Sequence, residues 1–228
     1  MRLLRILLPL VAGLALIAGC GGGDDEQADG TIRHLEIGYT SGERSTTAET
    51  WSLRGGLDAA SRSRVLEDGE VASDIALSEG FLEVWTPEAG QVMETPAQAA
   101  VSPDPFSAAD ALVDQGTLTA AGTVTRDGKE LQAYTGSPEY FLLSGAKGTF
   151  APAAATVRYL RDDAADRPVE LRIPAARVTP EGGPATRVPV QRFVVTGFRE
   201  YPATEEAMEV FDLKALYDGA GTGTATAP

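Results

Sequence analysis

The chain holds one cysteine and one histidine, Cys20 and His34, and this scarcity limits the chemistry open to it. A zinc site with several imidazoles is excluded, because such sites draw on several His or Cys side chains. A Ser-His-Asp triad would depend on His34, near the start of an expected strand, and no Gly-x-Ser-x-Gly elbow supplies its serine. The carboxylates show no spacing typical of an acid/base pair. We therefore expect no catalytic residue, no cofactor and no enzyme.

Two further patterns resemble ligand loops but lack the parts that such loops need. The acidic run with Asp162, Asp163 and Asp166 offers carboxylate oxygens for Ca²⁺, but it lacks the glycine and the distal glutamate of an EF-hand loop. We interpret it as a solvated hairpin turn. The Gly-rich run 219–223 has no strand–helix context and does not predict a phosphate loop. No metal site is expected.

The first twenty residues have the three zones of a secretory signal peptide. Arg2 and Arg5 precede an apolar run, residues 6–17, and the small pair Ala18-Gly19 stands directly before Cys20. The apolar run is shorter than the roughly 20 residues of a transmembrane helix. This ending resembles the bacterial lipobox, whose cysteine becomes the lipidated first residue of the mature protein. We predict a lipoprotein signal peptide over residues 1–19 and attachment of acyl chains such as palmitate to Cys20.

The alternatives are an ordinary cleaved signal peptide or an uncleaved signal anchor, with Cys20 incidental. A thiol is the best side-chain nucleophile for forming a thioether, and Cys20 is the only thiol of the chain. Two or three acyl chains anchor a protein stably, whereas a single chain is marginal. We therefore expect a lipid-anchored protein on the extracytoplasmic face of a cell membrane, in the cell envelope or periplasm.

The charge balance excludes one class of partner. The chain has 19 basic and 33 acidic residues, a formal charge of −14, and loss of the signal peptide leaves 17 basic residues and a charge of −16. Nucleic-acid binding rests on Lys and Arg contacts to phosphate, so no nucleic-acid partner is expected. Anionic headgroups should repel the domain as well, which leaves the acyl chains as the link to the membrane.

The composition along the chain predicts one folded domain between two tails. Residues 20–30 comprise the lipidated cysteine and a Gly-rich, acidic tether without an apolar side chain large enough to pack. Residues 219–228 form a tail of small residues that we expect to be disordered. The domain spans residues 31–218, and it must be stabilised by burial alone because no second cysteine is present.

The domain alternates apolar and polar residues with period two over most of its length. Short strands are predicted between turns at Ser41–Arg44, Asp68-Gly69, Glu79-Gly80, Pro87–Gly90 and Asp127-Gly128. Hairpin signals at such short spacing favour an antiparallel meander.

Two helices interrupt the strands. The first begins at Asp104-Pro105 and ends before Gly116, with an apolar stripe that includes Phe106 and Leu112. The second covers Thr204–Tyr217, after a long strand from Val188 to Phe198. In all we expect about ten strands and two short helices, a mostly β (α+β) domain.

Over its whole length the domain resembles the LolA-like lipoprotein-carrier superfamily, which includes LppX- and LprG-like lipoproteins and RseB/MucB-type sensor domains. The resemblance rests on an early hairpin with a tryptophan, a strand that ends in a proline turn, a hairpin with an acidic turn, and a closing strand: Glu49-Thr50-Trp51, Phe81–Pro87, Tyr159–Leu171 and Phe198–Pro202. The long first helix common in the carriers is absent or shrunk, since strand pattern begins by Ile32.

The resemblance implies a strongly curved antiparallel sheet, a half-open β-barrel with helices on its concave side. Such a sheet leaves a concave apolar face that side chains need not fill. The candidates for lining this cavity are the large aromatic residues Trp51, Phe81, Trp85, Phe106 and Phe193. Burial of the same side chains in an ordinary core is the alternative for each of them.

Three functions remain open. The first is a carrier that binds a lipid or the acyl chain of a lipoprotein. The second is a sensor or regulatory module that binds an envelope protein, through a sheet edge that the missing helix could leave open. The third is a structural lipoprotein with a filled core. Fold-level analogy alone does not decide among them.

Overall fold

The structure, a computed structural model, describes residues 30–54, 60–96, 104–143 and 147–217. The predicted signal peptide, Cys20, nearly all of the tether and the C-terminal tail lie outside these residues. The strands of the described residues are β1 (Thr31–Ser41), β2 (Arg44–Arg54), β3 (Ser61–Glu67), β4 (Glu70–Ser78), β5 (Phe81–Trp85), β6 (Val92–Pro96), β7 (Thr119–Arg126), β8 (Lys129–Gly136), β9 (Gly148–Ala151), β10 (Val157–Asp162), β11 (Arg167–Ile173), β12 (Ala176–Pro180), β13 (Thr186–Val188) and β14 (Gln191–Pro202). The helical elements are α1 (Pro105–Asp114), α2 (Glu139–Leu143), α3 (Glu205–Met208), the 3₁₀ turn η1 (Glu209–Phe211) and α4 (Leu213–Tyr217).

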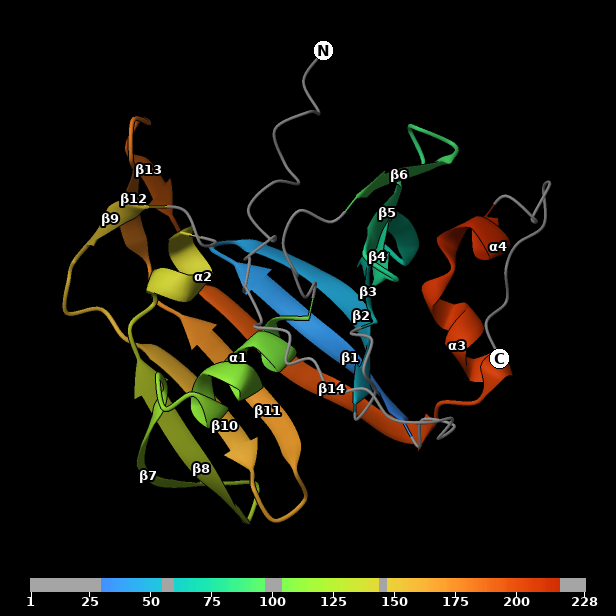
Figure 1. Ribbon diagram of the computed structural model, residues 1–228. Helices are drawn as coiled ribbons and strands as arrows, with labels where there is room; N and C mark the ends of the chain where they lie inside the picture. The colour runs from blue at the N-terminus through green and yellow to red at the C-terminus, as the bar shows by residue number, and fades with distance from the viewer. Residues whose placement is uncertain (1–29, 55–59, 97–103, 144–146, 218–228) are drawn as a thin grey trace, which may run out of the picture. The chain divides into compact units, whose positions relative to one another are not determined.

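Eleven of these strands form one antiparallel sheet, in the order β6-β5-β4-β3-β2-β1-β14-β11-β10-β8-β7. The two end strands, β6 and β7, pair on one side only, so the sheet does not close into a barrel. The prediction of a mostly β fold built on one large open antiparallel sheet is confirmed (Figure 1). A second, three-stranded sheet has the order β13-β12-β9.

The tight turns of this sheet follow from residue pairs that accept positive φ angles. Asp68 and Gly69 have φ values of 53° and 84°, and Asp127 and Gly128 have values of 51° and 76°. Positive φ at both central residues is the geometry of a type I′ turn, whose twist matches that of the flanking strands. These pairs therefore set the β3–β4 and β7–β8 hairpins, as the sequence predicts.

The described residues fall into two compact units. The first comprises residues 37–45 and 105–196, and the second comprises residues 30–36, 46–104 and 197–217, each with the gaps given above. Strands β1, β2 and β14 contribute residues to both.

In the first unit, α1 packs against β11 and its neighbours. Phe106, Ala108, Ala109 and Leu112 of α1 are buried, and the ring centre of Phe106 lies 6.3 Å from that of Tyr159 on β10. The hydroxyl of Tyr159 donates a hydrogen bond of 2.6 Å to Oδ1 of Asp110 in the same helix. Figure 1 shows α1 lying across β10 and β11.

The three-stranded sheet of the first unit has its own small core. Leu143 of α2, Ala176 and Val178 of β12 are buried together, with Phe150 of β9 and Val188 of β13 packed against them. The sequence analysis missed α2, β9, β12 and β13. These elements are three to five residues long and show too few alternations for a period-two pattern.

In the second unit, the last helical elements of the described residues cover one face of the sheet. Residues 205–217, here called the C-terminal segment, comprise α3, η1 and α4. Phe211 of this segment is buried with Ile32 of β1, Trp51 of β2 and Ala60. Thr204 caps α3 by accepting a hydrogen bond from the backbone N–H of Ala207 at 3.2 Å.

Two expected boundaries are wrong. The long strand predicted from Val188 to Phe198 is divided, because Val188 ends β13 and β14 runs from Gln191 to Pro202. Pro189 lies between them and has no N–H to donate to a ladder. The helix predicted over Thr204–Tyr217 is broken into three pieces, and Asp212 separates η1 from α4 with an extended ψ of 94°.

Candidate functional site

The face of the second unit that lies opposite the C-terminal segment carries small hydroxyl side chains. Directly paired residues of antiparallel strands point to the same face, and so do residues two apart. Thr50 on β2 pairs with Ser63 on β3, and Ser63 pairs with Ile75 on β4. The hydroxyl residues of this face and the aliphatic residues beside them on β4 and β5 are here called the hydroxyl face: Thr50, Ser52, Ser61, Ser63, Ser73, Ile75, Leu77, Leu82 and Val84.

The five hydroxyl residues of this face are buried, although serine and threonine usually lie at the surface. Thr50 is 1% exposed and Ser73 is 3% exposed. Within the described residues, Thr50 Oγ1, Ser52 Oγ and Ser73 Oγ have no hydrogen-bond partner. A buried hydroxyl without a partner costs free energy, so this face is poorly suited to be a finished core.

Apolar side chains flank the hydroxyls. Ser61 pairs with Leu77, Leu77 pairs with Leu82, and Ile75 pairs with Val84. Leu77 is buried, while Leu82 and Val84 are half-buried. The middle of this face therefore holds small side chains bordered by aliphatic ones, so that apolar side chains and a few polar groups lie together, a combination that ligand sites share.

Three of the five aromatic residues expected to line a cavity lie on the other face of this sheet. Trp51 pairs with Arg62, Arg62 pairs with Ala76, and Ala76 pairs with Glu83. Phe81 and Trp85 stand two residues on either side of Glu83 and share its face. Trp51 and the two other aromatics therefore point away from the hydroxyl face.

The C-terminal segment lies against this aromatic face. The backbone N–H of Leu213 donates to Oε2 of Glu83 at 2.8 Å, and Nη1 of Arg62 donates to the carbonyl of Val210 at 2.9 Å. The ring of Tyr217 stacks on Trp85 with centres 4.1 Å apart. The chain thus occupies part of its own aromatic face, and only Phe81, at 41% exposure, remains open there among the three aromatic candidates.

Trp51 sits within a stack of cationic and aromatic groups. The ring of His34 lies parallel to it at 4.6 Å, and the guanidinium of Arg62 lies 4.7 Å from the ring centre. His34 Nε2 is 3.7 Å from Oε1 of Glu49. Such contacts stabilise a packed core, and they give His34 no hydroxyl or thiol neighbour to activate.

The remaining two candidates belong to the first unit. Phe106 is fully buried beside Tyr159, and Phe193 on β14 is buried and stacks on Tyr39 at 4.7 Å. The five aromatic residues are therefore divided between the units rather than gathered at one pocket. Their role in lining a ligand cavity stays a prediction.

The first unit exposes a row of arginines on the face that α1 does not cover. Arg158 on β10 pairs directly with Arg172 on β11, and Arg172 pairs with Arg192 on β14. Their neighbours in sequence, Tyr159 and Phe193, point to the opposite, buried side. All three arginines, here called the arginine row, are exposed.

One buried carboxylate lies beside this row. Oε2 of Glu170 accepts hydrogen bonds from Arg192 at 2.7 Å and from Arg126 at 2.8 Å. Burial, the largest influence, would raise the pKa of Glu170, but these hydrogen bonds and the two cations together lower it. The hydrogen bond with Glu170 also raises the pKa of Arg192.

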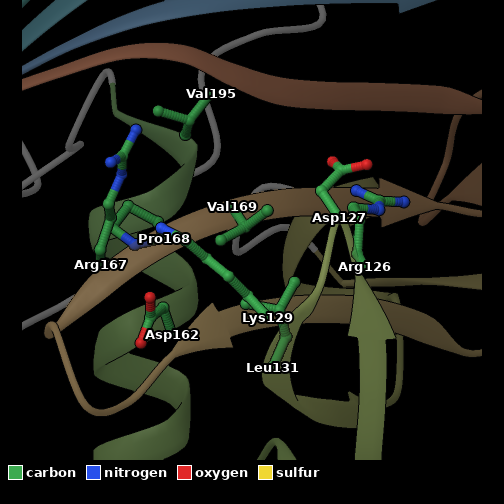
Figure 2. A pocket seen from close by; sticks show the side chains of 9 residues that line it. All are labelled: Arg126, Asp127, Lys129, Leu131, Asp162, Arg167, Pro168, Val169 and Val195. Carbon is green, nitrogen blue, oxygen red and sulfur yellow. The ribbon is translucent and has the colours of Figure 1, made fainter.

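A pocket of about 220 Å³ adjoins the same ion pairs, because Arg126 lines it. Figure 2 shows Pro168 and Val169 between Arg167 on one side and Arg126 on the other. Its lining combines apolar and basic side chains with two carboxylates: Arg126, Asp127, Lys129, Leu131, Asp162, Arg167, Pro168, Val169 and Val195. A second pocket, of about 470 Å³, is lined by Ala151, Ala175, Ala176, Arg177, Ala185 and Arg187. Neither pocket includes any of the five aromatic candidates.

The acidic turn binds its own chain. Asp163 accepts a hydrogen bond of 2.8 Å from the hydroxyl of Tyr134, Asp166 pairs with Arg161, and Asp162 Oδ1 accepts from the backbone N–H of Ala165 at 3.2 Å. Within the described ranges, no three His, Cys, Asp or Glu side chains are grouped so as to hold a metal ion.

None of the helices among the described residues combines the length and the apolar character needed to cross a membrane.

Sequence reasoning did not identify the hydroxyl face or the arginine row. The alternation of β11 predicts that Glu170 and Arg172 face outward, and Arg172 is exposed whereas Glu170 is buried beneath its arginine partners. The neighbours of Arg172, Arg158 and Arg192, follow only from the strand register. Ser61 and Ser63 belong to a run of four polar residues, Ser61–Arg64, which shows no alternation of apolar and polar side chains. Their burial depends on the sheet around them.

No protein-family model matches the chain, and no curated protein matches it. Among solved structures, an uncharacterised conserved protein from Thermus thermophilus has a TM-score of 0.45 and 13% identity, over 82% of this chain and 83% of that one. A chain of the Pseudomonas aeruginosa MucA/MucB complex has a TM-score of 0.42 and 15% identity, over 77% of this chain and 54% of that one. Mycobacterium tuberculosis lipoprotein LppX has a TM-score of 0.38 and 12% identity, over 75% of this chain and 87% of that one.

The kinds of protein that the sequence resembles, LppX-like lipoproteins and MucB-type domains, are thus among its structural neighbours. This chain spans about half of the matched chain in the MucA/MucB complex. All three TM-scores lie below 0.5, and the identities lie between 12% and 15%, so these neighbours assign no function to the chain.

Proposed function

We propose that the chain is a lipid-anchored lipoprotein of the cell envelope whose domain binds, without catalysis, a lipid or the acyl chain of a lipoprotein. The anchor is supported by the charged, apolar and small zones of residues 1–19 and by Cys20 directly after them. Cys20 then fixes the domain on the extracytoplasmic side, through a tether of about ten residues.

The observation that supports ligand binding is the hydroxyl face. It combines aliphatic side chains with buried hydroxyls that lack partners within the described residues, Thr50, Ser52 and Ser73. An acyl chain would cover the aliphatic part, at about 0.8 kcal/mol for each methylene removed from water. A polar headgroup or ester would supply partners for the hydroxyls, which removes the cost of burying them unpaired.

The test fills the hydroxyl face. Ser63→Leu places a large side chain in its middle, so the purified lipoprotein should retain at least about tenfold less co-purified lipid, a loss of about 1.4 kcal/mol. The measurement is native mass spectrometry with lipid extraction after gentle purification from a lipid-containing host. Thr47→Ile is the matched control, because Thr47 lies at the exposed end of β2 on the aromatic face.

The milder change Ser63→Ala separates binding from folding. It removes only a hydroxyl, so the fold and the lipid should both be kept. Wild-type protein that carries no lipid beyond its own anchor would refute acyl-chain binding. Equal lipid in Ser63→Leu and wild type, with matching circular dichroism, would remove the hydroxyl face as the site.

A second function, regulation through a protein partner, is favoured by the free edge of β7. Among the described strands it pairs with β8 alone, and from Thr119 to Thr125 it carries no charged side chain. Edge strands without charge accept an added strand from a partner. The opposite edge, β6, is shorter and ends in Pro96, which blocks such addition.

Photocrosslinking in cells distinguishes this function. A crosslinker at the exposed Thr125 of β7 should capture one envelope protein, whereas the same group at the exposed Thr95 of β6 should not. Absence of any adduct from Thr125, with the anchored protein at its normal level, rejects the edge as a docking strand.

A further inference from the structure

The arginine row carries an electrostatic cost that the described residues relieve only at Arg192. Side chains directly opposite on neighbouring antiparallel strands lie about 5 Å apart at Cβ, and like charges there destabilise the sheet. Arg158, Arg172 and Arg192 repeat this arrangement over three strands. Within the described residues only Arg192 of the row has a carboxylate partner, Glu170, although acidic residues greatly outnumber basic ones in the chain.

Apolar groups adjoin the arginines on the same face. Leu160 and Val194 pair with Glu170 and stand two residues from Arg158 and Arg192. Leu160 is buried with Leu131 and Ala133, and Val169 packs against them. The pocket of Figure 2 opens at this cluster, with Arg126 at its rim. Leu160, Leu131 and Ala133 are themselves covered, but Val169 and Val194 are half-buried and leave a small apolar area beside the arginines. A bilayer interface accepts cationic side chains next to such an area.

We propose that this face of the first unit docks on anionic phospholipid headgroups of the membrane to which the chain is tethered. The inference rests on the proposed lipid anchor at Cys20. From Cys20 to the start of β1 at Thr31 an extended chain spans at most about 40 Å, so the domain stays close to the bilayer surface. A weak attraction is then sufficient to orient it.

The expected attraction is large enough to orient a domain that is already tethered, but not to recruit a free domain to the membrane. Each arginine near an anionic surface contributes about fivefold in partitioning, so three contribute on the order of a hundredfold. The acidic excess elsewhere in the chain opposes docking by other faces. An acidic polypeptide would also match the arginines, but the half-buried Val169 and Val194 beside them and the short proposed tether favour the membrane.

The test measures arginine reactivity in the anchored protein. The lipidated mature chain is reconstituted into vesicles of phosphatidylcholine, alone or mixed with phosphatidylglycerol, and phenylglyoxal modification is followed by peptide mass spectrometry. Arg158 and Arg172 should react at least about fivefold more slowly in the anionic vesicles. The protection should disappear at high salt, because screening shortens the reach of the charges. The exposed Arg44 of β2 is the internal control and should react equally in both.

The double variant Arg158→Gln/Arg172→Gln tests cooperation in the row, since it leaves the Arg192–Glu170 pair in place. Arg192 should lose its protection in this variant and keep it in Arg158→Lys/Arg172→Lys. Equal reactivity of the row in both vesicle types overturns the inference. Protection that needs native membranes, and is absent from anionic vesicles, overturns it in favour of an acidic polypeptide. A chain that enters neither vesicle type shows instead that the lipid anchor is wrong.

Discussion

Asp74 on β4 is the acceptor for three side chains while it is fully buried. Arg62 donates to both of its oxygens, at 2.8 and 2.5 Å, and Arg64 donates at 3.2 Å. The hydroxyl of Tyr217 donates to Oδ2 at 2.7 Å. A buried ion pair contributes little net stability, but removing one partner leaves the other charge buried and unpaired. This carboxylate also joins β4 to the end of the C-terminal segment.

The first prediction follows from that pairing. Asp74→Asn should lower the free energy of unfolding by about 3 to 5 kcal/mol, because Arg62 keeps its charge and loses its counterion. Urea unfolding followed by tryptophan fluorescence measures it. Glu67→Gln, at the exposed end of β3, should change the stability by less than about 0.5 kcal/mol. A similar loss in both variants would show that Asp74 has no special role.

The second prediction concerns alkaline pH. Burial, reinforced by the charge and hydrogen bond of Asp74, raises the pKa of Tyr217 to about 12. The unfolded chain ionises this phenol near pH 10, before the folded chain does. Tyr217 therefore contributes stability that is present below pH 10 and is lost as the pH rises toward 12.

Tyr217→Phe tests this contribution. The variant should be about 1 kcal/mol less stable at neutral pH, since the hydroxyl donates one charge-assisted hydrogen bond. The difference from wild type should shrink above pH 10, as measured by urea unfolding at stepped pH. A difference that does not change with pH would mean that the hydroxyl does not titrate with the fold.

At the residue scale, the sequence predicts the character of a side chain better than it predicts which residues that side chain contacts. It identifies five aromatic side chains that line a cavity or belong to a core. Trp51, Phe106 and Phe193 are buried, whereas Trp85 is half-buried and Phe81 is exposed. The sequence does not predict that Arg62 lies over Trp51, or that Ser63 points to the other face. Both facts depend on which strand pairs with which and in what register, and a one-residue slip would exchange the two faces.

Among the elements, those with strong local signals were predicted and those without were missed. Hairpins closed by Asp-Gly or Glu-Gly pairs and the Pro105 start of α1 agree with the structure. The small sheet β13-β12-β9 has short strands within a proline-rich stretch, and its stability comes from packing with α2. Local propensity does not report such packing.

The third prediction tests the small sheet. A Cβ added at Gly148 of β9 would lie 2.6 Å from the carbonyl oxygen of Thr179 on β12, closer than real contacts allow. Gly148→Ala should therefore destabilise the protein by about 1 to 3 kcal/mol, by forcing the strands apart. Thermal unfolding by calorimetry gives the value. Gly183→Ala is the matched control, since its nearest neighbour, Cβ of Pro180, is 3.4 Å away. No difference between the two would show that β9 and β12 separate at little cost.

At the scale of the whole molecule, the net charge does not show how charged side chains are distributed between the two units. Among the described residues of the second unit, acidic side chains outnumber basic ones by more than two to one, whereas in the first unit the two kinds are equal. An average charge of −14 therefore coexists with an exposed basic row. The expectation that anionic lipid repels the domain assumes that charge is spread evenly over its surface. The register of β10, β11 and β14 instead gathers three arginines at one place.

The fourth prediction concerns the anchor. In cells fed radiolabelled palmitate, the wild-type chain should carry label and partition into detergent, while Cys20→Ala should carry none and remain unprocessed or be released. The chain has no other thiol to which a thioether could form. Labelling that persists in Cys20→Ala would refute the lipoprotein assignment. Loss of label with unchanged membrane retention would favour an uncleaved signal anchor.

The position of β1 determines how the domain bears load. This strand follows the proposed tether directly and lies between β2 and β14 in the sheet, hydrogen-bonded on both sides. The carbonyl of Gly30, just before it, also accepts a bond of 2.8 Å from the backbone N–H of Ala203. A force applied through the proposed anchor would thus act on an interior strand. The hydrogen bonds of β1 to β2 and to β14 would then have to break together. If the anchor were joined to an edge strand, the same force could separate that strand from the sheet one hydrogen bond at a time.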